Sequence, residues 1–246
     1  MFFDPMYLLF VLLPTLAVSG WAAWRVKATY ARWSKVDSGI NLSAFDFARR
    51  LLDHQGLMHV KVEATPGELT DHYDPRGKIL RVSDSVASSE PAEYDQQQPF
   101  QAVVVGKRLS VAAAAVIAHE VGHALQDHAG EPAMKLRQAI VPAAQVGSNL
   151  GPWLVIAGVI FGLTGLAMVG VIFFAAAVVF TFATLPVELG ASGKALAFVN
   201  TLGMSGERHD GARDVLKAAA WTYVAAALTA LLTFLYYAWL VFGRRN

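Results

Sequence analysis

Two histidines and a glutamate near the middle of the chain have the residue types and spacing that suit metal chemistry. His119 and His123 are four residues apart, so on a helix they lie on one face, where two imidazoles can chelate one metal ion. Glu120 lies about 100° around such a helix and can reach a metal-bound water without being a ligand. This H-E-x-x-H pattern is typical of zinc metallopeptidases, in which the glutamate is the general base.

The pattern requires a third ligand, because a catalytic zinc site takes three protein ligands and keeps one position open for water. The chain contains no cysteine, so this ligand must be a histidine or a carboxylate. We expect Glu188, since two membrane crossings separate it from the histidines and return it to their side. The alternative is an interfacial carboxylate at a helix N-terminus after Pro186. Asp127 is expected to support the site or cap the helix, and His128 and His209 are expected to be surface residues.

A polar segment before the motif supplies the candidate donors for the oxyanion of a tetrahedral intermediate. His72 and Tyr73 lie in the sequence T-D-H-Y-D-P-R-G, and both side chains can donate hydrogen bonds. The alternative is a structural turn, in which Asp71 or Asp74 bonds nearby backbone amides. Within the motif itself, Gly122 indicates the close approach of another backbone, either a substrate or an edge strand.

These residues need a helix and a few strands to hold them. Ser110 is a suitable N-cap and the alanine-rich run behind it has high helix propensity, so we expect a helix over Ser110–Asp127. Asn41–Gly56 has amphipathic spacing and ends at a glycine, which predicts a second helix. The other predicted elements are short strands at Leu57–Val62, Lys78–Ser83 and Val103–Val105 and an acidic, glutamine-rich surface loop at Ser88–Gln101.

The composition of the chain is shifted towards that of a membrane protein. Of its 246 residues, 55% are hydrophobic and 16% are charged, whereas soluble domains are about 45–50% apolar and about 25% charged. The formal net charge of +1 argues against a basic nucleic-acid-binding protein. The absence of cysteine excludes disulfides, thiolate zinc sites and cysteine nucleophiles. We therefore expect the lipid bilayer as a partner and no nucleic acid.

Four apolar runs are long enough to cross a bilayer. The first, residues 6–24, has no basic segment before it and is followed at once by basic residues, which favours an uncleaved anchor with an external N-terminus. Trp153–Met168 and Val169–Leu185 are predicted to form an uncharged hairpin, and Ala218–Phe242 is the last span. The terminal arginines would then lie outside, against the positive-inside rule, which is statistical and weaker for later spans.

The predicted fold is a mostly α-helical integral membrane protein with about four transmembrane helices and a small α+β cytoplasmic portion. We expect a multi-pass protein of the cell (inner) membrane with its site on the cytoplasmic side. The predicted parts are an N-terminal anchor at 1–24, a cytoplasmic region with the motif helix at 25–150, a transmembrane hairpin at 151–187, a segment with the third ligand at 188–217 and a C-terminal transmembrane helix at 218–242.

Four short motifs spread over most of the chain strengthen this interpretation. They are L-T-D-H-Y-D-P-R at Leu69–Arg76, I-A-H-E-V-G-H-A-L-Q at Ile117–Gln126, L-P-V-E followed by A-S within Leu185–Ser192, and T-Y-V-A-A-A-L at Thr222–Leu228. In their order and spacing the chain resembles the neutral zinc metallopeptidases of the YugP-like type, which are bacterial membrane proteins. The resemblance implies a zincin-like, gluzincin-type site with one zinc ion, in which His119, His123 and Glu188 are ligands and Glu120 is the general base.

The chain departs from the family pattern at two places. The family usually reads E-F-D-A-S after the ligand glutamate, whereas this chain has Leu189 and Gly190 before Ala191. An aspartate at position 190 would orient a ligand histidine, so its loss is expected to weaken metal affinity or activity, typically by about 10- to 100-fold. The segment Ser88–Gln101 resembles an insertion that could cover the cleft.

The sequence therefore predicts a peptidase that cleaves a peptide or a membrane protein. Zinc would activate a water and polarise the scissile carbonyl, while Glu120 would take the proton and deliver it to the leaving amine. One alternative is a non-catalytic membrane scaffold or chaperone-like partner with a structural metal, which the glycine at position 190 favours. Another is a zinc hydrolase that acts on a bond other than a peptide bond.

Overall fold

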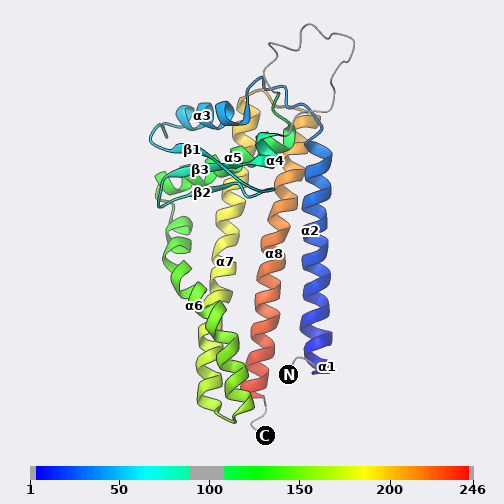
Figure 1. Cartoon of the computed structure of the whole chain (residues 1–246), viewed down its shortest axis with the longest axis vertical. Coiled ribbons are helices and arrows are strands. Elements are labelled where there is room, and N and C mark those ends of the chain that lie inside the picture. Colours follow the sequence, from blue (N-terminus) through cyan, green and yellow to red (C-terminus); the bar gives the residue numbers. More distant parts are fainter. Residues whose placement is uncertain (1–3, 89–107, 244–246) are drawn as a thin grey trace. The chain divides into compact units, whose positions relative to one another are not determined.

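A computed structural model of the chain describes residues 4–88 and 108–243 (Figure 1). The protein is mostly helical, with one small sheet, as the sequence predicts. Four helical segments are long and apolar enough to cross a membrane. These segments are Pro5–Trp33, Pro132–Ile160, Thr164–Thr201 and Glu207–Phe242.

The described residues fall into two compact units. The helical unit contains residues 4–24, 132–187 and 220–243, and the site unit contains residues 25–88, 108–131 and 188–219. Three of the long helices contribute residues to both units, because the boundaries fall inside them.

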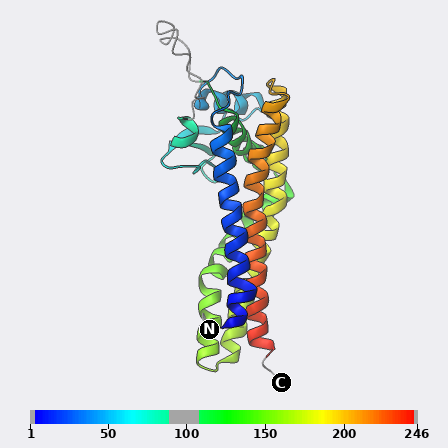
Figure 2. The ribbon, with the colours of Figure 1, turned by 90° about the vertical axis from the view of Figure 1, so that its right-hand side faces the viewer.

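The first helical segment of the helical unit is continuous, although its winding changes. It consists of α1 (Pro5–Tyr7), the π-helical η1 (Leu8–Leu12) and α2 (Leu13–Trp33). Asp4 starts it by accepting a hydrogen bond from the amide of Met6, and Tyr236 of α8 (Glu207–Phe242) donates to the same carboxylate. Further along, Trp21 meets Trp221 edge to face, so α2 and α8 lie side by side (Figure 2).

Helices α6 (Pro132–Ile160) and α7 (Thr164–Thr201) pack closely because glycines line their contact. A Cβ atom at Gly147 would be 2.1 Å from the carbonyl oxygen of Phe173, and one at Gly158 would be 2.4 Å from the amide of Ala167. Small residues let two membrane helices approach to backbone contact.

The hairpin between these helices differs from the predicted one. Its turn lies at 161–163, where Gly162 takes a φ of +68°, and α7 continues past Pro186 to Thr201. The expected turn between Met168 and Val169 is therefore wrong, because hydropathy is uniform along this stretch and only the glycine conformation fixes the reversal. Glu188 consequently lies inside a helix and not at a helix N-terminus.

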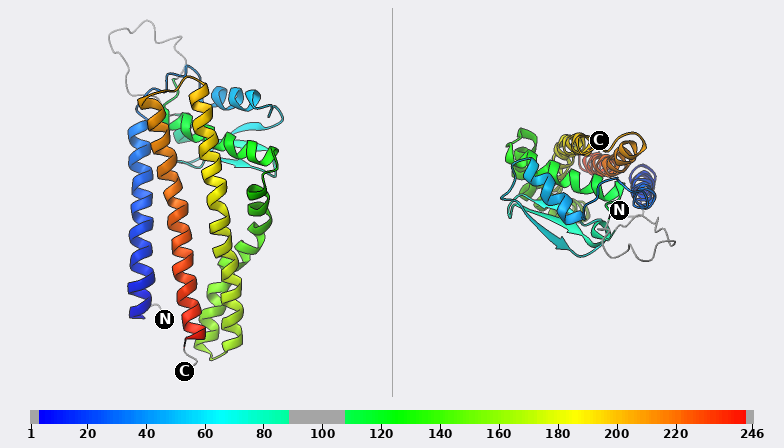
Figure 3. Two further views of the ribbon diagram at one scale, coloured as in Figure 1. Left: turned by 180° about the vertical axis from the view of Figure 1, so that it is seen from behind. Right: turned by 90° about the horizontal axis from the view of Figure 1, so that it is seen from above.

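The predicted amphipathic helix is present in the site unit as α3 (Ala44–His54). Ser43 caps it by accepting a hydrogen bond from the amide of Asp46, and Gly56 follows its end with a φ of +73°. One face of α3 is buried, and the helix packs against α5 (Val111–His128). Figure 3 shows the two helices next to each other.

The sheet has three strands, β1 (Lys61–Thr65), β2 (His72–Asp74) and β3 (Ile79–Ser83), in the order β1-β3-β2. β3 lies in the middle, parallel to β1 and antiparallel to β2. The first strand was expected at Leu57–Val62 and instead begins at Lys61. His72–Asp74 form a strand and not the expected turn, because Tyr73 is buried and pairs with Leu80 of β3. The expected turn is present just after this strand, where Asp74 accepts a hydrogen bond from the amide of Arg76.

Helix α5 begins as predicted, with the Ser110 hydroxyl accepting a hydrogen bond from the amide of Ala113. Its alanines at 112–115 are fully buried, so the start of the helix lies inside the site unit. The short helix α4 (Asp84–Ala87) precedes it in the sequence. Residues 89–107 lie outside the described residues, and so do the expected strand Val103–Val105 and nearly all of the expected loop Ser88–Gln101.

Close approach of a second backbone at Gly122 is confirmed, but the neighbour is a helix. A Cβ atom at this position would be 2.7 Å from the carbonyl oxygen of Ala191 in α7. The glycine therefore lets α5 and α7 touch inside the site unit, one turn from His119 and one turn from Glu188 in their respective helices.

Candidate metal centre

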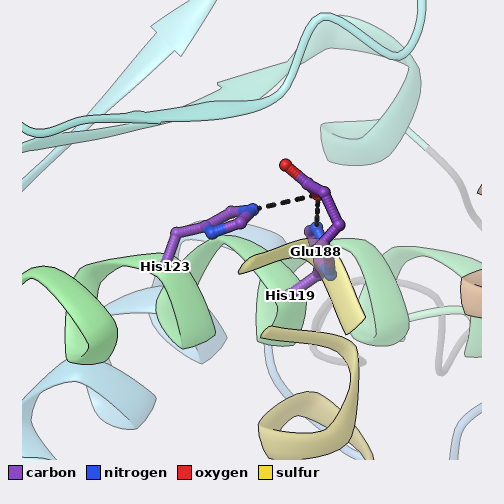
Figure 4. Close-up of side chains that lie close together, drawn as sticks. All are labelled: His119, His123 and Glu188. Carbon is purple, nitrogen blue, oxygen red and sulfur yellow. Dashed lines mark hydrogen bonds and ion pairs between the residues drawn. The ribbon is translucent and has the colours of Figure 1, made fainter. Parts of the chain in front are cut away.

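The three residues predicted as ligands lie together in the site unit (Figure 4). His119 and His123 come from successive turns of α5, and Glu188 comes from α7. One carboxylate oxygen of Glu188, Oε2, is 3.1 Å from Nε2 of His119 and 3.3 Å from Nε2 of His123. One donor atom from each residue lies within 4.8 Å of the others.

The geometry of this cluster fits a zinc ion. Two ligand atoms on a tetrahedral zinc ion are about 3.4 Å apart, because each lies about 2.1 Å from the metal. The separations from Glu188 to the two histidines, 3.1 Å and 3.3 Å, are close to this value. Two imidazole nitrogens and a carboxylate oxygen are also a donor set that zinc prefers. The cluster could hold the metal with little rearrangement.

The cluster is largely shielded from water. The exposed fraction is 7% for His123 and 2% for Glu188. A carboxylate at this depth is costly unless it is paired with a cation or held by hydrogen bonds. Within residues 4–88 and 108–243, this is the only group of three such side chains close enough to share a metal ion.

The second ring nitrogen of each histidine also has a partner. Nδ1 of His123 is 3.0 Å from Oε1 of Gln126, and Nδ1 of His119 is 3.2 Å from Oγ of Ser192. Sequence reasoning did not identify these two residues. Their spacing was a usable signal, since Gln126 is three residues after His123 and Ser192 is four residues after Glu188, and such neighbours share a helix face.

Glu120 is buried beside the ligands. Its Oε2 accepts a hydrogen bond of 2.8 Å from the backbone amide of Tyr73 in β2. Burial raises the pKa of Glu120 to about 7, with nearby His119 opposing the rise and the charge of Glu188 adding to it. A carboxyl group with a pKa near neutrality can both accept and return a proton at physiological pH.

Tyr73 is close to the site, but its hydroxyl group is directed to another residue. The hydroxyl donates a 2.7 Å hydrogen bond to Oδ2 of Asp127, and the ammonium group of Lys78 pairs with the same oxygen. Burial, together with this contact to Asp127, raises the pKa of the Tyr73 phenol. Asp127 thus ties β2 and the following turn to α5.

The other polar residues named from the sequence have contacts with residues other than the three ligands. The ring of His72 is exposed, with Nδ1 bonded to the carbonyl of Thr70 and Nε2 to Arg81. His128 is exposed, with its ring centroid 5.7 Å from that of His59 and the two rings tilted by 39°, and His209 is partly exposed. Whether His72 and Tyr73 act on an oxyanion stays a prediction.

Gly190, at the position where the family usually has an aspartate, lies next to Gln126. A Cβ atom at Gly190 would be 2.8 Å from Nε2 of Gln126. A side chain at position 190 would therefore contact the Gln126 amide, which in turn contacts His123. The expected loss of metal affinity at this position stays a prediction.

Two comparisons with known proteins point to the same family. The family model described as "Putative neutral zinc metallopeptidase" matches residues 7–92 and 102–242. The chain is also 36% identical over 242 residues to "Putative membrane protease YugP" of Bacillus subtilis (strain 168), covering 98% of this chain and 99% of that protein. A comparison with solved structures found no match.

Proposed function

Because the chain belongs to the neutral zinc metallopeptidase family, we propose that it is a zinc-dependent membrane peptidase that hydrolyses peptide bonds. The observation that carries this proposal is the meeting of Glu188 with His119 and His123, beside the buried carboxyl group of Glu120. Among the described residues this donor group has three members, which is the number of a catalytic site, whereas a structural zinc site is closed by four protein ligands. The alternative of a purely structural metal is thereby disfavoured.

The zinc ion, when bound, would lower the pKa of a coordinated water towards 7 and polarise the carbonyl group of the scissile bond. Glu120 accepts the proton of the attacking water and returns it to the leaving amine. Its place beside the ligands suits both steps, and the amide of Tyr73 holds one of its oxygens in place. His72 and the Tyr73 phenol are the proposed oxyanion donors, and the phenol would exchange Asp127 for the oxyanion.

The substrate is proposed to be a peptide or a membrane protein, and the site is proposed to face the cytoplasm. The basic residues Arg25, Lys27, Arg32 and Lys35 support this orientation, because they follow the first apolar segment and basic residues favour the cytoplasmic side. The apolar surfaces of the four long helices support a multi-pass protein that contacts the bilayer.

Purified protein in detergent provides the test, through zinc content and casein cleavage. In Glu120→Gln, zinc should be retained while cleavage falls by about 100-fold or more, since general base catalysis typically contributes about 10²–10⁴-fold. In Glu188→Ala, both zinc and cleavage should be lost. Glu207→Gln is the matched control, because Glu207 is exposed in the same unit. The proposal is wrong if Glu120→Gln cleaves casein as fast as the unmodified protein.

A further inference from the structure

The ring nitrogen of each ligand histidine that faces away from Glu188 contacts a polar side chain, and the proposed peptidase mechanism gives that side chain no role. Oε1 of Gln126 lies 3.0 Å from Nδ1 of His123, and Oγ of Ser192 lies 3.2 Å from Nδ1 of His119. We propose that Gln126 and Ser192 are positioning residues that fix both histidines in the tautomer that presents Nε2 to the metal. The inference rests on the proposed metal site, but it concerns zinc affinity and not the bond that is cleaved.

The Gln126 contact selects one tautomer of His123. Nε2 of His123 faces Glu188, so a metal at the cluster needs the lone pair of that nitrogen, and the proton must then be on Nδ1. An Nδ1–H group needs an acceptor, which the side-chain carbonyl of Gln126 provides. If the amide were reversed, its NH₂ group would face Nδ1 and would favour a proton on Nε2, which blocks metal binding.

The surroundings of Gln126 exclude water and leave room for its amide. The residue is only 1% exposed, so water does not compete for the contact with His123. Its Nε2 lies beside Gly190, where a Cβ atom would approach to 2.8 Å. Any larger residue at position 190 would require the amide of Gln126 to move. The absence of a side chain at Gly190 therefore leaves space for the Gln126 amide.

The Ser192 contact follows from the geometry of α7. Ser192 is four residues after Glu188, so the ligand and the serine lie on the same face of the helix, one turn apart. Glu188 meets Nε2 of His119 and Ser192 meets Nδ1 of the same ring. One turn of α7 thus contacts both ring nitrogens of His119, and in the tautomer that presents Nε2 to the metal Oγ accepts a hydrogen bond from Nδ1–H.

Zinc affinity, measured by competition with a chromophoric chelator on the detergent-purified full chain, tests the proposal. Gln126→Met keeps the volume but removes the acceptor, and Ser192→Ala removes the hydroxyl. Each should raise the Kd for zinc by about 10- to 100-fold, which is typical for loss of a group that orients a metal ligand. Gln126→Glu restores an acceptor and should bind zinc much more tightly than Gln126→Met. Gln145→Met, at an exposed position of α6, is the matched control and should keep the original Kd.

A second measurement separates positioning from folding. With EDTA, Gln126→Met should still melt in one cooperative transition, a few degrees below the unmodified protein, because it keeps the volume but leaves Nδ1 of His123 without its hydrogen-bond partner. The proposal is overturned if Gln126→Met binds zinc with the original Kd, or if Gln126→Glu loses as much affinity as Gln126→Met. Should the unmodified protein bind zinc but fail to cleave casein, the proposed function fails while this inference stands.

Discussion

At the scale of single residues, the burial of Glu120 makes the metal-free protein sensitive to pH. Its folded pKa of about 7 lies above the ordinary value of 4.5, so folding favours the protonated form. As the pH rises from 4.5 to 7, the unfolded chain gives up this proton before the folded protein does. The contribution of Glu120 to the free energy of unfolding therefore decreases across this window and stays constant above it.

We predict that Glu120→Gln stabilises the metal-free protein more at pH 7.5 than at about pH 4.5, because glutamine cannot ionise. The measurement is the melting temperature of both proteins with EDTA at the two pH values. Glu207→Gln, at an exposed position, should show no such difference. An advantage of equal size at both pH values would mean that burial of Glu120 does not perturb its ionisation.

At the scale of elements, Tyr73 connects the edge of the sheet to two points on α5. Its backbone amide bonds Glu120 and its hydroxyl bonds Asp127, seven residues further along the same helix. Tyr73 therefore ties β2 to the part of α5 that carries the site. The sequence did not predict this strand, because β2 has only three residues and two polar residues flank its one buried side chain.

We predict that Tyr73→Phe lowers the free energy of unfolding by about 1.5–3 kcal/mol, the usual range for a hydrogen bond to a charged group. Cleavage should fall less than in Glu120→Gln, because the backbone amide that holds Glu120 remains. Chemical denaturation and casein cleavage provide the two readouts. Tyr30→Phe, which removes a hydroxyl bonded to the carbonyl of Ser85, is the control and should leave cleavage unchanged. Unaltered stability in Tyr73→Phe would contradict the role of this contact.

The contact between α5 and α7 depends on Gly122. We predict that Gly122→Ala greatly reduces zinc binding, because a Cβ atom 2.7 Å from the carbonyl oxygen of Ala191 would push the two helices apart. Gly193→Ala is the matched control in α7, since no atom lies within 4 Å of its Cβ position. The control should be neutral or gain up to about 1 kcal/mol from better helix propensity. Equal zinc content in the two variants would show that this close approach is not needed.

At the scale of the whole molecule, the orientation in the membrane is the property to test. The proposed topology puts the site unit in the cytoplasm and the turn between α6 and α7 outside. The chain has no cysteine, so single cysteines can be introduced without background labelling. Met58 in the site unit and Phe161 at the turn are suitable, because their exposed fractions are 74% and 72%.

We predict that an impermeant maleimide labels Phe161→Cys in intact cells and labels Met58→Cys only after permeabilisation. Labelling of both variants after permeabilisation controls for expression. The reverse pattern would mean that the chain is inserted with its site outside, and that the basic residues after the first span do not determine its orientation.

The sequence by itself determined the features that depend on neighbours along the chain. The spacing of His119 and His123 places them on one helix face, and Ser110 with the alanine-rich run defines where that helix begins. The long apolar runs likewise predict the four helices that could cross a membrane, since both properties follow from local periodicity and composition.

The sequence predicted Glu188 as the third ligand, but only the tertiary structure decided how closely such distant side chains meet. Glu188 is 69 residues from His119 in sequence, yet their side chains are 3.1 Å apart, because Gly122 lets α7 approach α5. Gln126 is only three residues after His123, but that its side-chain oxygen faces Nδ1 became clear only from the tertiary structure. Such contacts depend on how helices pack, on rotamers and on single glycines, whereas hydropathy and spacing carry information about one element at a time.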